Sequence, residues 1–93
     1  MLDIPYHAID RQADTLGGRI SFARDVLDLS TEDAARILGV EARTWANWEK
    51  DRAEPRANRL SMLAGVLQVS LPWLLTGQGH GPDWEEPSPV DVH

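Results

Sequence analysis

The residues with the most suggestive chemistry lie in one short stretch, RTWANWEK, which begins at Arg43. If this stretch is a helix, successive residues turn by about 100°, and Trp45 and Trp48 fall on the same side. Arg43, Asn47 and Lys50 then fall on the opposite side. Arginine and asparagine form paired hydrogen bonds with guanine and adenine in the major groove of DNA. The stretch is therefore a candidate for a helix that is anchored by its tryptophans and displays a base-reading face.

Two interpretations of this helix stay open when it is considered alone. Ala46 is small and lies beside the polar residues, which would let the helix approach a groove closely. Any amphipathic helix, however, shows its polar residues to water, and such a surface needs no partner. The helix by itself supports both interpretations equally.

The residues before this stretch favour the first interpretation. The sequence TEDAARILGV carries Ala35, a small residue at the point where two steeply crossing helices would touch. Gly39 permits a sharp turn in the left-handed conformation. Val40 and Trp45 can fill the angle between the two helices. This combination is the physical specification of a helix-turn-helix, in which the second helix lies in the major groove.

The spacing of apolar residues predicts five short helices, so the expected fold class is all-α. Hydroxyl side chains that can cap a helix precede three of them, at Thr15, Ser30 and Ser70. We expect left-handed glycines to end two of them, at Gly39 and Gly77. The predicted helices span 15–29, 31–38, 42–50, 55–67 and 71–76, with Pro55 and Pro72 in the first turns of the last two.

The composition is that of a single globular domain. The chain has 93 residues, of which 42% are hydrophobic and 26% are charged, as is ordinary for a soluble domain. It has no cysteine, which excludes a disulfide framework and suits a reducing compartment. The N-terminus lacks the pattern of a secretory signal, and no apolar run approaches the roughly 20 residues of a membrane span. We therefore expect a cytoplasmic protein without a membrane partner.

The net charge of -6 at first argues against a nucleic-acid partner, because duplex DNA is bound by neutralising its phosphates. The acidity, however, belongs to the two ends of the chain. Residues 1–14 carry three acids and one base, and residues 78–93 carry four acids and no lysine or arginine. Residues 36–59 carry six bases and four acids. The predicted organisation is an N-terminal arm over 1–14, a helix-turn-helix domain over 15–77, and an acidic, disordered tail over 78–93.

No catalytic or metal-binding pattern is found in the sequence. The three histidines, His7, His80 and His93, are scattered without the spacing of metal ligands. There is no Ser-His-Asp grouping, no phosphate-binding glycine loop and no pair of carboxylates in a plausible cleft. We therefore expect that the protein is not an enzyme and uses neither a cofactor nor a metal.

The chain as a whole resembles the Xre-type regulators, the helix-turn-helix class of the lambdoid phage repressors and Cro. LGGRISFAR is similar to the first helix of that family, LSTEDAARILGVEARTWANWE to its helix-turn-helix, and LSMLAGVLQVSLPWLLTGQG to its closing helices. The phrase Trp-Leu-Leu-Thr-Gly is especially characteristic. The resemblance covers about residues 15–77 and implies a five-helix lambda-repressor-like fold that binds double-stranded DNA.

The resemblance also implies roles for individual residues. Family positions that face base edges correspond here to Ala42, Arg43, Ala46 and Asn47. Family positions that meet the DNA backbone correspond to Ser30, Thr31, Thr44, Lys50, Arg52 and Arg56. A structural ion pair between the first and third helices corresponds to Arg24 and Glu49.

Four positions depart from the family pattern. Trp45 stands where the smaller isoleucine or valine is usual, so the recognition helix is expected at a shifted angle. Thr31 stands where family members usually have glutamine, and its hydroxyl reaches less far. Glu41 stands at a cap position where serine or threonine is usual, and its charge would repel a phosphate. Asp51 stands where a glycine usually follows the recognition helix, although aspartate tolerates the left-handed conformation better than most residues.

The favoured function is a sequence-specific DNA-binding transcriptional regulator, a homodimeric repressor that binds an inverted repeat. The predicted dimer contact is the apolar fifth helix, through Leu71, Trp73, Leu74 and Leu75. The alternative is an antitoxin-like adaptor that binds a basic protein partner through its acidic tail and Trp84 and also regulates its own expression. The sequence leaves both functions open.

Overall fold

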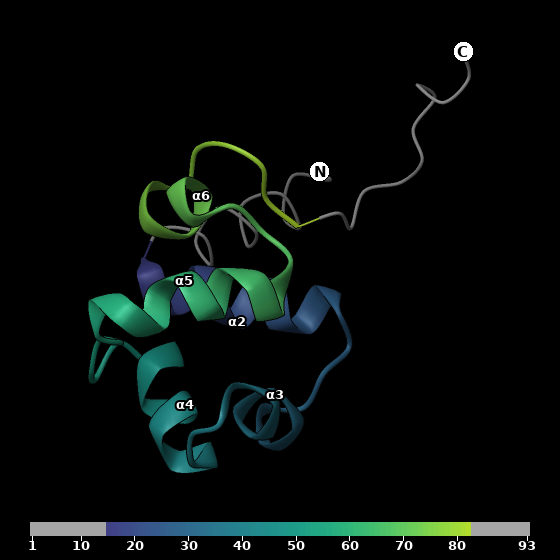
Figure 1. Ribbon diagram of the computed structural model, residues 1–93, viewed down its shortest axis with the longest axis vertical. Coiled ribbons are helices and arrows are strands. Elements are labelled where there is room, and N and C mark those ends of the chain that lie inside the picture. The colour runs from purple at the N-terminus through teal and green to yellow at the C-terminus, as the bar shows by residue number, and fades with distance from the viewer. Residues whose placement is uncertain (1–14, 83–93) are drawn as a thin grey trace, which may run out of the picture.

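The computed structural model describes residues 15–82, and these form five α-helices with no strand among them (Figure 1). The helices are α2 (Leu16–Val26), α3 (Thr31–Leu38), α4 (Ala42–Glu49), α5 (Ala57–Leu67) and α6 (Leu71–Thr76). The predicted all-α fold class is confirmed. The predicted N-terminal arm, and the tail from residue 83 onward, lie outside the described residues.

The helix boundaries are set largely by local capping. The hydroxyls of Thr15, Ser30 and Ser70 each accept a hydrogen bond from the backbone N–H three residues later, at 2.9 to 3.1 Å. These bonds satisfy N–H groups that have no partner within the helix. Gly39 (φ 92°) and Gly77 (φ 86°) end α3 and α6 in the left-handed conformation. The caps that the sequence predicted at these five positions are all present.

The first helix is shorter than the predicted span of 15–29. It ends at Val26, and Asp28 has a positive φ of 60°. Arg24 donates from its Nη1 to the carbonyl oxygen of Leu29 at 2.7 Å, which holds the chain in this turn. The helix ends in a local turn, in which the amides of Leu27 and Leu29 donate to the carbonyls of Ala23 and Arg24 at 3.3 Å each, and the apolar pattern alone does not reveal this turn.

Pro55 does not lie in the first turn of a helix, contrary to the prediction. The helix α5 begins at Ala57, and Arg56 is its N-cap with an extended backbone (ψ 159°). Pro55 is buried and closes the loop that follows α4. The prediction failed because a proline that packs against the core has the same local sequence signal as one that starts a helix.

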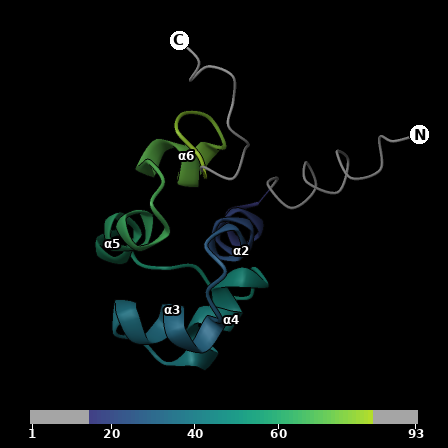
Figure 2. The same ribbon diagram turned by 90° about the vertical axis from the view of Figure 1, so that its right-hand side faces the viewer.

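The helices α2 and α5 form the middle of the molecule, with α3 and α4 at one end and α6 at the other (Figures 1 and 2). Each helix contributes to one apolar core, which makes the described residues a single packed unit. The fully buried large side chains come from four of the five helices: Ile20, Trp45, Leu63, Leu67 and Leu74. The residues after α6 return over this end, since the Ser70 amide donates to the carbonyl of His80 at 2.9 Å.

A charged network ties α4 to α2 at one end of the interface between them. Arg24 donates from Nε to Oε2 of Glu49 at 2.5 Å and from Nη2 to Oε1 at 3.1 Å. The indole Nε1 of Trp45 donates to the same carboxylate at 2.6 Å. The side chains of Arg24 and Glu49 are only 17% and 11% exposed. The hydrogen bond with Glu49 raises the pKa of the Arg24 guanidinium, so this cation stays charged over the whole physiological range.

A glycine allows the start of α2 to touch the end of α4. A Cβ atom at Gly17 would overlap the carbonyl oxygen of Trp48 and would lie 2.6 Å from Oδ1 of Asp51. Both approaches are far closer than van der Waals contact, and the first of them involves backbone. Gly17 is thus required by close packing between two helices. Gly65 in α5 differs, because a Cβ atom there would have no neighbour within 4 Å.

We expect Gly17→Ala and Gly65→Ala to change stability in opposite directions. Gly17→Ala should lower the free energy of unfolding by about 1–3 kcal/mol, because the methyl group forces α2 away from α4. Gly65→Ala should raise it by about 0.4–1 kcal/mol, because alanine restricts the unfolded chain and meets no neighbour. Urea denaturation of the two variants measures both changes. Equal effects would show that α2 and α4 do not approach as closely as described.

Two arginines, each paired with a carboxylate, provide a matched test of the network. Arg24→Ala should lower the free energy of unfolding by about 3 kcal/mol, because Glu49 is left partly buried without its cation. Arg36→Ala, which removes the exposed pair with Asp33 (side chains 70% and 49% exposed), should cost at most about 1 kcal/mol. Denaturation curves for both variants decide this. Similar losses for the two arginines would contradict a stabilising role for the Arg24–Glu49 pair.

Candidate nucleic-acid interface

The helix α4 is anchored through its tryptophans. Trp45 is 0% exposed and Trp48 is 5% exposed, and their ring centroids lie 5.9 Å apart. On the opposite side Arg43 and Lys50 are exposed, and Asn47 is half-buried between them. Ala42 and Ala46 are half-buried on the same side. The helix therefore presents a polar face with small residues, and this face cannot rotate without removing two indoles from the core.

The connection between α3 and α4 has the geometry of a helix-turn-helix. Gly39 turns the chain in the left-handed conformation, and its N–H and that of Val40 both donate to the carbonyl of Ala35, at 2.8 and 2.9 Å. Ala35 is 1% exposed, so the small residue predicted at the crossing does lie inside. Figure 1 shows the two helices joined at a steep angle by this short turn. Glu41 precedes α4 as its N-cap but makes no side-chain capping bond.

The residues expected to contact a DNA backbone occupy two places on the fold. Ser30 and Thr31 lie at the N-terminus of α3, where the Ser30 hydroxyl already caps the helix. Thr31 donates from its hydroxyl to Glu32 at 3.3 Å and is only half-buried. The other expected contacts lie on α4 and in the loop that leads to α5: Thr44, Lys50, Arg52 and Arg56.

The basic residues divide sharply into engaged and unengaged sets. Those of α2 and α3 have partners within the chain: Arg19 donates to the carbonyls of Leu74 and Leu75, Arg24 pairs with Glu49, and Arg36 pairs with Asp33. Five further bases within residues 15–82 form no ion pair and no side-chain hydrogen bond there. These unengaged bases all follow the turn, on α4, in the next loop and at the start of α5: Arg43, Lys50, Arg52, Arg56 and Arg59.

Two of the four acids of this region, Glu49 and Asp51, are engaged in internal contacts, whereas Glu41 and Glu54 are exposed and form no ion pair within residues 15–82. Glu49 is bonded to Arg24 and Trp45, and Asp51 is bonded to residues at the start of α2. The sequence count treated every acid and base between 36 and 59 as equal, which hides this separation. The Arg24–Glu49 pair is the one that the family resemblance implied, whereas the contacts of Asp51 could not be inferred from the order of charges, because Thr15 and Gly17 lie 36 and 34 residues away in the chain.

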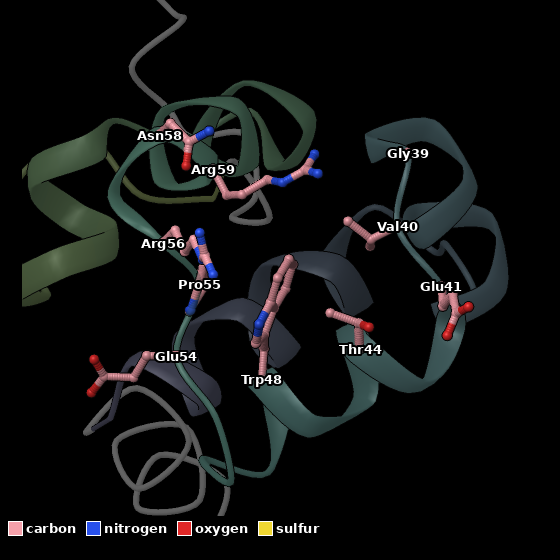
Figure 3. Close-up of a pocket in the computed structure, with 10 residues that line it drawn as sticks. All are labelled: Gly39, Val40, Glu41, Thr44, Trp48, Glu54, Pro55, Arg56, Asn58 and Arg59. Carbon is pink, nitrogen blue, oxygen red and sulfur yellow. The ribbon is translucent and has the colours of Figure 1, made fainter.

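A groove of about 590 Å³ runs between the turn, the flank of α4 and the start of α5. Figure 3 shows Trp48 at its centre, with Thr44 on one side and Arg56 on the other. Arg59 extends across the groove towards Val40 (Figure 3). Arg59 is a candidate contact that sequence reasoning missed, because its position in the first turn of α5 depends on where that helix begins. The groove is lined by Arg56, Arg59 and the Thr44 hydroxyl, which suit a phosphate-bearing chain, but also by the carboxylates of Glu41 and Glu54, which would repel one.

Residues 15–82 carry no sign of a metal centre or of a membrane span. Within this range no group of three histidines, aspartates or glutamates is placed to hold a metal ion. The helices of the same region are also too short or too polar to cross a membrane. Trp84, which the adaptor hypothesis uses as an anchor, lies outside the described residues.

Comparison with known proteins agrees with this geometry. The helix-turn-helix family profile matches residues 22–74, which is more than half of the chain. The chain is 33% identical over 63 residues to the HTH-type transcriptional regulator DicA of Escherichia coli K12. That match covers 68% of this chain but 47% of DicA, so the chain spans about half the length of this relative.

Two solved structures of the P22 c2 repressor share the fold. The crystal structure of that repressor with a synthetic operator gives a TM-score of 0.66 at 30% identity, covering 69% of this chain and 97% of that one. The NMR structure of its DNA-binding domain gives 0.67 at 29% identity, covering 70% and 86%. The chain therefore belongs to the helix-turn-helix family, among the Xre-type regulators that its sequence resembles.

Proposed function

We propose that the protein is a sequence-specific DNA-binding transcriptional regulator whose α4 lies in the major groove. The observation that carries this proposal is the separation of the basic residues. Every unengaged base within residues 15–82 lies on α4 or shortly after it, while Arg24 and Arg36 are paired with carboxylates and Arg19 is bonded to backbone carbonyls. Such a surface is what phosphate binding requires, and it exists despite the acidic net charge.

The polar face of α4 supplies the proposed base contacts. Arg43 is exposed and can pair with a guanine, and Asn47 can pair with an adenine. Ala42 and Ala46 on the same face have small side chains, so the helix backbone can come close to the base edges. An α-helix with its side chains is about 10–12 Å across, so α4 fits the major groove, which is about 12 Å wide.

The flanking residues supply the proposed backbone contacts. Ser30 and Thr31 reach one strand from the start of α3, and Thr44 lies on the flank of α4. Lys50, Arg52 and Arg56 reach the other strand from the loop before α5. Support for this arrangement comes from the P22 c2 repressor, which was solved on a synthetic operator and of which this chain covers 97%.

The proposed active form is a homodimer that acts as a repressor on an inverted repeat. One recognition helix reads too few base pairs for useful specificity, and a two-fold dimer doubles the site. The proposed dimer surface is the outer side of α6, where Leu75 is 45% exposed and Leu71 is partly buried. Trp73 and Leu74, which the sequence also assigned to this contact, are instead 7% and 0% exposed and belong to the core.

The base-reading and backbone roles give different responses to substitution. Arg43→Ala and Asn47→Ala should each lower affinity for the selected operator by about 1–3 kcal/mol and relax the preference at particular base pairs. Lys50→Ala and Arg56→Ala should weaken binding to all duplexes alike and reduce the slope of log affinity against log salt by about one. Fluorescence anisotropy on operator and scrambled duplexes separates these responses. Unchanged affinity and base preference in Arg43→Ala would refute the proposed placement of α4.

The dimer is tested by comparing two exposed apolar side chains at opposite ends of the molecule. Leu75→Glu on α6 should convert the protein from a dimer to a species of one chain mass, 10.4 kDa, because the charge is buried in the proposed contact. Ile37→Glu on α3, where the side chain is 59% exposed, should leave the mass unchanged. Light scattering gives both masses. A wild-type monomer at tens of micromolar, alone and with DNA, would contradict the dimer.

A further inference from the structure

Asp51 forms a connection that the family resemblance does not include. It is the second residue after α4, with a positive φ of 58°, and it stands where a glycine is usual. Its carboxylate accepts two hydrogen bonds from the start of α2. The donors are the hydroxyl of Thr15 to Oδ2 at 2.8 Å and the amide of Gly17 to Oδ1 at 2.9 Å.

These bonds fix the chain at the junction between α4 and the loop that follows. Asp51 also donates its own amide to the carbonyl of Trp48 at 3.1 Å, and Arg52 donates its amide to the carbonyl of Asn47 at 2.9 Å. Both side-chain oxygens and the backbone of Asp51 are therefore held. Its neighbours in the chain are Lys50 and Arg52, two unengaged bases.

We propose that Asp51 is a positioning residue for DNA binding, which anchors the loop after α4 to the N-terminus of α2 and so aims Lys50 and Arg52 at the DNA backbone. This inference rests on the proposed function. The carboxylate does not touch DNA. It lowers the freedom of the loop, so that less conformational entropy is lost when the two cations engage phosphates.

If Asp51 positions the loop, removing its side chain should change DNA affinity in the opposite direction from removing an ordinary surface acid. An acidic side chain beside a phosphate-binding loop repels DNA, and removing a mere surface charge would strengthen binding. If Asp51 positions the loop, losing its hydrogen bonds should weaken binding even though the negative charge is also lost. The two effects oppose each other, so the choice of replacement can separate them.

Asp51→Asn and Asp51→Gly form the decisive pair. Both remove the charge, and both asparagine and glycine accept the left-handed backbone. Asparagine can still accept from the Gly17 amide and donate to the Thr15 hydroxyl, whereas glycine can do neither. Affinity and its salt slope are measured by anisotropy on the duplex that the wild-type protein selects from a random pool. Unfolding curves establish that each variant is folded at the assay temperature.

We expect Asp51→Asn to bind DNA at least as tightly as the wild type. Asp51→Gly should bind about fivefold or more weakly than Asp51→Asn. In addition, Arg52→Ala should weaken binding less in the Asp51→Gly background than in the wild type, while Arg43→Ala should weaken both equally. If Asp51 had a purely structural role, Asp51→Gly would lower the free energy of unfolding, and Arg52→Ala would weaken DNA binding by the same factor in both backgrounds. If Asp51→Gly were too unstable, Thr15→Val against Thr15→Ser would test the same contact from α2. Because valine also removes the cap of α2, the two affinities are compared where unfolding curves show both variants folded, with Thr15→Val expected to bind more weakly.

Equal affinities for Asp51→Asn and Asp51→Gly would overturn the inference while leaving the proposed function intact. So would an Arg52→Ala effect that is the same in both backgrounds. Failure of the wild-type protein to bind any duplex in a salt-dependent manner would instead refute the proposed function, and the two failures are thus distinguishable.

Discussion

The bond network of Arg24, Glu49 and Trp45 is the interaction on which the orientation of α4 depends. Glu49 and Trp45 lie on α4, Arg24 lies on α2, and one carboxylate joins all three. The indole is fully buried, so its N–H needs a partner, and Glu49 provides it directly. Because the tryptophan face is fixed in this way, the opposite face of α4 is directed outward. The same network holds the carboxylate of Glu49 on the tryptophan side of α4, away from Arg43 and Asn47.

Internal pairing also explains how an acidic chain can carry a DNA-binding surface. The net charge of -6 describes the whole chain, but binding depends on the charges that remain free at one surface. Arg19 and Arg36 are used within the fold, and Glu49 and Asp51 are bonded to the α2 region. What is left on α4 and the following loop is predominantly positive. The cations proposed to meet DNA are therefore not the ones that stabilise the fold.

Local chemistry made much of the fold predictable, and tertiary contacts account for most of the failures. The caps at Ser30 and Ser70 and the turn at Gly39 depend on residues close in sequence, so pattern reasoning identifies them. The side of α4 that holds Trp45 follows from helical spacing in the same way. The contacts of Asp51 with the start of α2 join residues 34 and 36 positions apart, which no local pattern reveals. The residues proposed to meet DNA were identified from their side-chain types and from the family resemblance. Only the structure shows which of them are free and which are paired within the fold.

The most direct test of the central claim is selection of duplexes by the full-length protein from a random pool, followed by sequencing of the bound fraction. We predict enrichment of an inverted repeat whose half-sites are centred about 34 Å apart, one turn of DNA. We also predict that the protein with Arg43 replaced by alanine no longer enriches one defined base pair in each half-site. A bound pool without any enriched motif, or an enriched motif that is the same with and without the Arg43 side chain, would contradict the claim that α4 reads DNA.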